Sequence, residues 1–204
     1  SLVKKAINLS NLIGSKIYGI HAGYLSDSIA DEKGKFVFEK KNNDYAQSIK
    51  NSVKFLNLSV KYAKQKKVKI LIENLFPSTK KNKSLFCTFD QIRDLMQELP
   101  KDIGILLDLG HLQISSKFYN LDKNKELEKI LNFYSDRIYE VHLSENNEKD
   151  DLHQSIKKNS WQIKAIKKIK NCKTFENIER KFCLEVRNES IENINKSLDL
   201  INNL

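Results

Sequence analysis

The sequence predicts an α/β fold in which parallel strands alternate with helices. Short apolar runs end at Glu73, Asp108 and His142, and these ends are 35 and 34 residues apart. That length fits one strand, one helix and two loops, a repeat that joins parallel strands by right-handed crossovers. The runs VKILIE and IGILLD are apolar without alternation. Such runs are typical of strands that are buried on both faces.

The first half of the chain shows helix and strand patterns with clear boundaries. Gly14 ends the first amphipathic run, and Asp44 is placed to cap a long helix. The apolar stripe of this long helix consists of Ile49, Val53, Leu56 and Val60. The predicted elements are a helix at 2–13, a strand at 16–21, a long loop at 22–43, a helix from 44 to about 65 and a strand at 68–73.

The second half continues the same alternation. Thr88 is a suitable N-cap, and Pro100 marks the end of the helix that follows it. The predicted elements are a helix at 89–98, a strand at 103–108, a helix at 123–134, a strand at 138–143, a helix at 160–170, a strand at 181–186 and a helix at 189–203. A sixth short strand is expected at 153–157 or 174–178. Composition does not change along the chain, so we expect one domain over residues 1–204.

Composition favours a globular protein of the cytoplasm. The chain has 204 residues and is 40% hydrophobic, without an apolar run long enough to span a bilayer. The first residues, SLVKKAINLS, lack the apolar core of a signal peptide. Cys87, Cys172 and Cys183 are widely spaced and form no CxxC motif, which fits a reducing compartment.

The formal net charge of +10 comes mainly from lysine. The lysines are spread over segments such as KQKKVK and IKKIK rather than gathered in one stripe. Specific phosphate recognition usually recruits arginine. The arginines of this chain are Arg93, Arg137, Arg180 and Arg187. We therefore expect a solvated lysine-rich surface, and a nucleic-acid partner is disfavoured.

Four ionisable side chains end four of the predicted strands: Glu73, Asp108, His142 and Glu185. The carboxyl ends of parallel strands share one rim, where α/β enzymes collect ligands and catalytic groups. Three carboxylates and one imidazole suit a divalent cation, with Mn²⁺ or Mg²⁺ favoured and Co²⁺ or Zn²⁺ also compatible. The sequence thus predicts a metal site built from four strand ends.

Six short segments fall in an order and spacing that is similar to a known superfamily. These are IHAG (20–23), LIEN (71–74), LLDLGH (106–111), VHLSEN (141–146), DLH (151–153) and FCLEV (182–186). Together they resemble the xylose-isomerase-like TIM-barrel superfamily, which includes sugar-phosphate isomerases and epimerases and the endonuclease IV type of apurinic endonuclease. The resemblance implies a TIM-type barrel that lacks its first one or two βα units. A smaller open α/β sheet is the alternative, because a closed barrel takes about 250 residues.

The resemblance implies a metal-dependent isomerase or epimerase acting on a small sugar or sugar phosphate. Glu73 and Glu185 would transfer the proton beside the carbonyl, and the cation would stabilise the resulting enediolate. His21, Asn74 and His111 would bind substrate. Such an enzyme could also be a homo-oligomer.

Two alternatives remain open. In an endonuclease IV-type apurinic endonuclease, a zinc cluster hydrolyses DNA phosphodiesters, and His111, Asp151 and His153 could hold a second metal. In the other alternative, the chain is an incomplete scaffold that binds metal weakly and catalyses nothing. Metal count separates the two enzymes, since the isomerase needs one cation.

Two features depart from the pattern of the sugar epimerases. Those enzymes carry an arginine a few residues after the strand-end histidine, whereas this chain has Asn146, Asn147 and Glu148 there. This departure argues against a ketohexose epimerase. Glu140 lies two residues before His142, so its carboxylate is expected to point inward and to need a partner, for which a lysine or arginine is the simplest choice.

Overall fold

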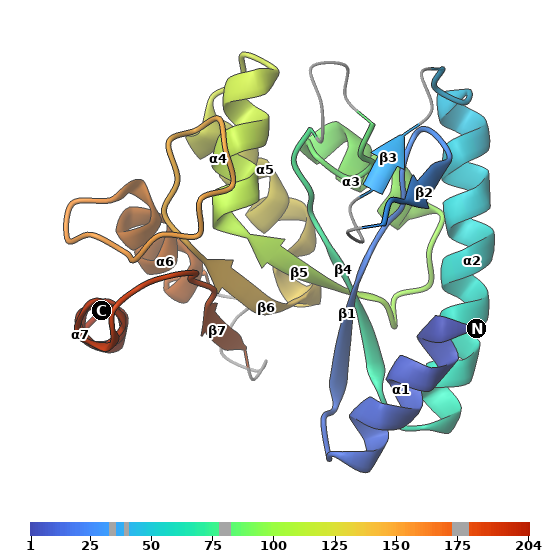
Figure 1. Ribbon diagram of the computed structural model, residues 1–204, viewed down its shortest axis with the longest axis horizontal. Helices are drawn as coiled ribbons and strands as arrows, with labels where there is room; N and C mark the ends of the chain where they lie inside the picture. The colour runs from blue at the N-terminus through green and yellow to red at the C-terminus, as the bar shows by residue number, and fades with distance from the viewer. Residues whose placement is uncertain (33–35, 39–40, 78–82, 173–179) are drawn as a thin grey trace. The chain divides into compact units, whose positions relative to one another are not determined.

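The computed structural model describes residues 1–32, 36–38, 41–77, 83–172 and 180–204. The chain divides into a first unit, Ser1–Ile103, and a second unit, Gly104–Leu204 (Figure 1). Both units combine parallel strands with helices, so the predicted α/β class is confirmed. In the described part of the chain, no helix is both long and apolar enough to cross a membrane. A single domain over the whole chain stays a prediction.

The first unit is built around one parallel strand pair. Its elements are α1 (Leu2–Leu12), β1 (Ile17–His21), β2 (Ser28–Ala30), β3 (Phe36–Phe38), α2 (Tyr45–Gln65), β4 (Lys69–Glu73) and α3 (Phe89–Gln97). Strands β1 and β4 pair with Ile17 opposite Lys69 and His21 opposite Glu73. Helix α1 packs on β1, and α2 packs on β4 and on α1. The register therefore brings two predicted site residues to the same strand end.

The predicted loop at 22–43 contains a small antiparallel pair, β2 and β3, which corrects the prediction. Ser28 lies opposite Phe38, and Ala30 lies opposite Phe36. Each strand has only three residues, and charged residues surround them in the sequence, so the apolar pattern is too short to stand out. The only composition signal is the run Phe-Val-Phe, which has high strand propensity.

Helix α2 follows the predicted cap and stripe. The Asp44 carboxylate accepts the backbone N–H of Gln47 at 2.9 Å. Ile49, Leu56 and Val60 are buried as expected, whereas Val53 is only half-buried. The N-cap predicted for α3 is also present, since the Thr88 hydroxyl accepts the N–H of Gln91 at 3.4 Å.

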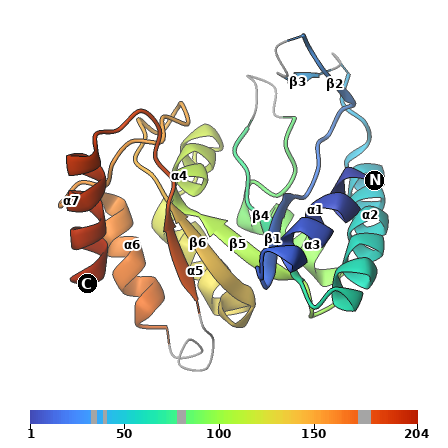
Figure 2. The same ribbon diagram turned by 60° about the horizontal axis from the view of Figure 1, so that its bottom comes forward.

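The second unit contains three parallel strands in the order β5, β6, β7. Its elements are β5 (Gly104–Asp108), α4 (Leu109–Phe118), α5 (Lys123–Tyr134), the 3₁₀ turn η1 (Ser135–Arg137), β6 (Ile138–Leu143), α6 (Trp161–Lys170), β7 (Lys181–Leu184) and α7 (Ile191–Asn202). Both views show α6 and α7 side by side, and α5 also packs on α6 (Figure 2). The central strand of this unit, β6, is the one that carries His142.

Helix α4 was not predicted, because its sequence lacks an amphipathic pattern. Residues 109–116 are all buried, so no polar face reveals the helical period. The helix starts where the Asp108 carboxylate accepts the N–H of His111 at 2.7 Å. One side chain therefore both ends β5 and caps α4, which places His111 on the first turn.

A sixth strand at 153–157 is not present, because Gln154 forms only an isolated antiparallel bridge with Glu145. The other predicted location, 174–178, lies outside the described residues. The remaining five predicted strands are all confirmed, with ends that differ by at most two residues.

Candidate metal site

Three of the four expected metal ligands meet in the second unit. Strand register places Asp108 beside His142 and His142 beside Cys183, and Glu185 lies two residues past Cys183. The His142 Nδ1 atom is 3.0 Å from Glu185 Oε2 and 3.9 Å from Asp108 Oδ2. One ligand atom from each of these three residues lies within 4.8 Å of the others. Parallel register thus converts three distant sequence positions into one group of donors.

Asp108 occupies the most protected position in this group. Its side chain is fully buried, and its Oδ1 atom is engaged by the His111 N–H. Its Oδ2 atom faces two imidazoles, at 3.8 Å from His111 Nδ1 and 3.9 Å from His142 Nδ1. A buried carboxylate is costly unless it is paired with positive charge or binds a metal. These surroundings suit either protonated imidazoles or a cation.

The loop between β6 and α6 brings two further ionisable groups to the site. Glu145 and Gln154 exchange backbone hydrogen bonds of 2.8 and 2.9 Å, which close the loop at its base. The His153 carbonyl accepts the Arg187 N–H at 2.8 Å, so the loop is also tied to the segment after β7. His153 has a φ of 49°, in the left-handed region.

Asp151 lies between two histidines. Its Oδ2 atom is 2.6 Å from His153 Nε2 and 3.8 Å from His111 Nε2. Burial alone would raise the pKa of Asp151, but the hydrogen bonds and charges of His111 and His153 hold this pKa below its ordinary value. His153 Nδ1 is 3.1 Å from the Glu185 carbonyl, which can only accept a hydrogen bond. The Nδ1 atom therefore donates to this carbonyl, and the Nε2 atom lies next to the Asp151 carboxylate.

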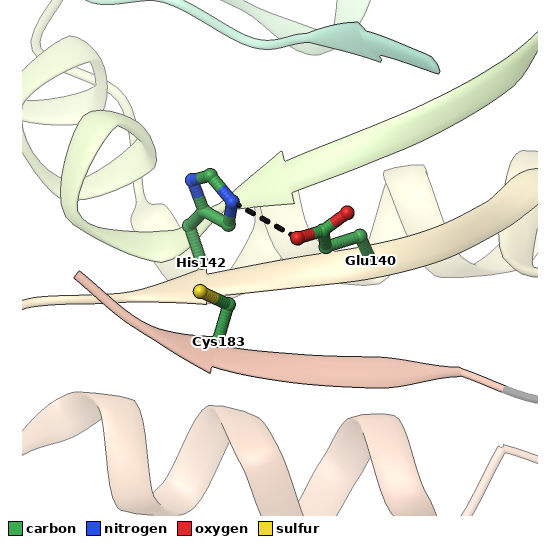
Figure 3. Close-up of side chains that lie close together, drawn as sticks. All are labelled: Glu140, His142 and Cys183. Atoms are coloured by element: carbon green, nitrogen blue, oxygen red, sulfur yellow. Dashed lines mark hydrogen bonds and ion pairs between the residues drawn. The ribbon is translucent and has the colours of Figure 1, made fainter. Parts of the chain in front are cut away.

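His142 also has neighbours on its other ring nitrogen (Figure 3). Its Nε2 atom is 3.3 Å from Glu140 Oε1, and Cys183 on β7 points into the same space. One ligand atom each from Glu140, His142 and Cys183 lies within 4.8 Å of the others. The expected lysine or arginine partner of Glu140 is thus a histidine. Cys183 itself is exposed.

The first unit holds the other predicted residues. Glu73 ends β4 with a mostly buried side chain, and its Oε2 atom is 3.5 Å from His21 Nε2. The His21 Nδ1 atom is 3.2 Å from the Tyr24 hydroxyl. Burial and the nearby Glu73 and Cys87 raise the pKa of Tyr24, so this hydroxyl stays protonated beside Nδ1. Asn74, the next residue after Glu73, is fully buried.

The structure thus shows where each predicted residue lies, while the catalytic, substrate-binding and metal-binding roles stay predictions. Sequence reasoning missed the contact of Tyr24 with His21 and the joint position of Glu140 and Cys183 around His142. The Tyr24–His21 contact depends on the conformation of the turn after β1. The position of Glu140 and Cys183 around His142 depends on the register of β6 and β7. The only available signal was that Glu140 and His142, two residues apart, share a strand face.

Solved structures with this fold include several sugar epimerases. A D-tagatose 3-epimerase-like protein is 22% identical, with a TM-score of 0.69 over 98% of this chain and 68% of that chain. The 3-keto-D-glucoside 4-epimerase of E. coli is 12% identical, with a TM-score of 0.67 over 99% of this chain and 69% of that chain. The D-psicose 3-epimerase of Clostridium cellulolyticum H10 is 14% identical, with a TM-score of 0.60 over 99% of this chain and 62% of that chain. These likenesses show the fold.

No curated protein sequence matches the chain. Residues 1–204 match the family described as the xylose isomerase-like TIM barrel. The predicted membership and the TIM-barrel fold class are confirmed. The chain spans 62–69% of the length of these three relatives. The prediction of a family of enzymes is confirmed as well. The chain belongs to the xylose isomerase-like TIM barrel family.

Proposed function

We propose that the chain is a divalent-metal-dependent isomerase or epimerase of a small sugar or sugar phosphate. The observation that supports this most is the meeting of Asp108, His142 and Glu185 within 4.8 Å at neighbouring strand ends. The epimerase activity named for the structural relatives supports the substrate class. Homo-oligomers and a cytoplasmic location stay predictions.

The donor set fits a hard divalent cation. Asp108 and Glu185 offer carboxylate oxygens, and His142 Nδ1 is directed between them. Oxygen-rich sites with one imidazole favour Mn²⁺ or Mg²⁺, and Co²⁺ and Zn²⁺ are compatible. When bound, such a cation stabilises the negative charge that develops on the carbonyl and hydroxyl oxygens of the sugar.

Glu185 is the candidate base in the second unit. Its side chain is 39% exposed, so the carboxylate can reach a substrate as well as the imidazole of His142. The His153 ring is held at Nδ1 by the Glu185 carbonyl, which fixes the backbone beside this carboxylate. Glu185 can then take a proton from the carbon beside the carbonyl.

The remaining roles follow from the family resemblance. We assign the returning acid to Glu73, which is also the fourth proposed cation ligand. His21, Asn74 and His111 are the proposed substrate contacts. His21 is half exposed and already hydrogen-bonded, so it can present a fixed N–H or lone pair to a hydroxyl group.

Exchange of substrate hydrogen with solvent tests this proposal. Ketoses and ketose phosphates are incubated in heavy water with Mn²⁺-loaded protein, and deuterium uptake is followed by NMR. We expect uptake that Glu185→Gln lowers by about 100-fold or more, as for loss of a general base. Glu192→Gln, an exposed carboxylate on α7, is the matched control and keeps the rate. Unchanged exchange in Glu185→Gln would exclude this base.

An apurinic endonuclease is the second candidate, and one observation favours it. His111, Asp151 and His153 form a close group of their own, with separations of 3.8 and 2.6 Å. Elemental analysis of protein purified without chelator separates the candidates. Cleavage of abasic DNA by protein that holds three zinc ions per chain supports the nuclease, whereas deuterium uptake without such cleavage supports the isomerase.

A further inference from the structure

We propose that Glu140, His142 and Cys183 form a second, thiophilic cation site that takes ions such as Zn²⁺ or Cd²⁺. The proposed sugar chemistry uses neither Glu140 nor Cys183, so this site goes beyond that function. It lies wholly within the second unit, on β6 and β7, and the close-up shows the three side chains turned toward one space (Figure 3).

The geometry supplies three different donor types at binding range. The His142 Nε2 atom and Glu140 Oε1 are 3.3 Å apart, and the Cys183 sulfur lies within 4.8 Å of both side chains' ligand atoms. Strand register explains this arrangement, because Cys183 is the β7 partner of His142, and Glu140 shares the strand face of His142. A sulfur, nitrogen and oxygen set favours zinc-like ions over Mg²⁺.

The site is accessible and not yet closed. Cys183 is exposed, so an ion from solvent can reach its sulfur. Three protein donors leave a fourth tetrahedral position for water, as in open zinc sites.

Binding exchanges protons for metal bonds. The S–H bond of Cys183 breaks, the sulfur–metal bond forms, and the thiol proton passes to the buffer. The metal takes the lone pair of His142 Nε2, and the ring proton then resides on Nδ1, which is 3.0 Å from Glu185 Oε2.

The two proposed sites use opposite nitrogens of one imidazole. The catalytic cation would take Nδ1, whereas the thiophilic ion takes Nε2. Thiol and metal-binding measurements therefore test the second site without any sugar, and its failure leaves the hydrogen-exchange test of the proposed function unaffected.

Titration of the metal-free protein with Cd²⁺ tests the site. The ultraviolet charge-transfer band of a cadmium–thiolate bond is followed, together with protection of thiols from a disulfide reagent by Zn²⁺. We expect a band that saturates at one thiolate per chain and is lost in Cys183→Ser. Cys172→Ser, also in the second unit, is the matched control and keeps the band. Cys87 is buried, and its raised pKa keeps it protonated.

A second variant guards against a folding defect. Glu140→Gln removes one ligand while keeping the volume, and we expect about tenfold weaker Cd²⁺ binding with the band retained. A band of equal size and midpoint in wild type, Cys183→Ser and Glu140→Gln would overturn the proposal. Loss of the band in Cys172→Ser but not in Cys183→Ser would overturn it equally.

Discussion

His142 is the residue around which the candidate site is organised. Its Nδ1 atom faces Glu185 and Asp108, and its Nε2 atom faces Glu140. An imidazole cannot donate from both nitrogens unless it is protonated, so three carboxylates compete for one or two protons. A bound cation removes this competition, because the carboxylates and one unprotonated nitrogen of His142 can then all bind the cation.

A second imidazole, His21, is held in one tautomer by Tyr24. The Glu73 carboxylate, 3.5 Å from Nε2, favours an N–H on that nitrogen, and the Nδ1 lone pair then faces the Tyr24 hydroxyl at 3.2 Å. We predict that Tyr24→Phe frees the ring, so nitrogen-15 NMR of His21 shifts toward a mixture of tautomers. Tyr45→Phe is the control, since that hydroxyl donates to Asp94 instead. Identical His21 nitrogen shifts in wild type and Tyr24→Phe would contradict this role.

The site could be predicted from the sequence only where one residue marks a strand end. Asp108, His142 and Glu185 each follow an apolar run, so their common rim could be inferred. Glu140 and Cys183 carried no such mark, because their neighbourhood depends on which strands pair and in which register. The chain position of a residue does not give that register.

At the scale of elements, α4 is packed against the segment that follows β6. A Cβ at Gly110 would lie 2.9 Å from Ser144 Oγ and 3.1 Å from the Ser144 carbonyl oxygen. The Gly110 carbonyl oxygen also accepts a hydrogen bond from the Asn146 side-chain amide at 3.0 Å. The first helical turn, which carries His111, therefore depends on a residue without a side chain.

We predict that Gly110→Ala destabilises the protein by about 1–3 kcal/mol, as expected for overpacking against backbone. Urea unfolding followed by circular dichroism measures the change. Adding Ser144→Ala removes the closer of the two contacts but leaves the carbonyl oxygen, so only partial recovery is expected. Wild-type stability in Gly110→Ala would show that the helix moves away without cost.

The N-cap of helix α5 makes the free energy of unfolding depend on pH. The Asp122 carboxylate accepts N–H groups of Asn124 at 2.8 Å and Lys125 at 3.3 Å, and these bonds lower its pKa. Because the folded pKa is lowered, this stabilisation is complete above the unfolded value of about 3.9 and is lost as pH falls through the folded value.

We therefore predict that Asp122→Asn, which caps without titrating, loses less stability than wild type between neutral and acidic pH. The urea midpoint at each pH gives the comparison. A parallel decline in both proteins would show that the Asp122 cap does not titrate on unfolding.

The helices that could be predicted from the sequence and the helix that could not differ in their solvent exposure. Helices α2 and α5 have one buried face, so their period is visible in the sequence. Helix α4 is buried along residues 109–116 and has no such period. Strands β2 and β3 are too short for any period to develop.

At the scale of the whole chain, two of the four arginines that contribute to the positive charge contact other groups of the protein. Arg93 pairs with Asp90 and Asp94 at 2.8 and 3.3 Å. Arg180 donates to the carbonyls of Ile138 and Ser135, each at 2.6 Å. These two guanidinium groups are therefore engaged in contacts within the protein.

The family resemblance adds Glu73 of the first unit to the proposed cation ligands of the second unit. We predict that Glu73→Gln weakens Mn²⁺ affinity by more than about tenfold, because even changes one shell further out cost about 10–100-fold. Isothermal titration compares this variant with Asp108→Asn, expected to weaken binding at least as much, and with Glu98→Gln, an exposed control in the first unit. If Asp108→Asn loses Mn²⁺ while Glu73→Gln binds it like wild type, Glu73 is not a ligand. Its contact with His21 would then be its main role, and the cation would rest on the second unit alone.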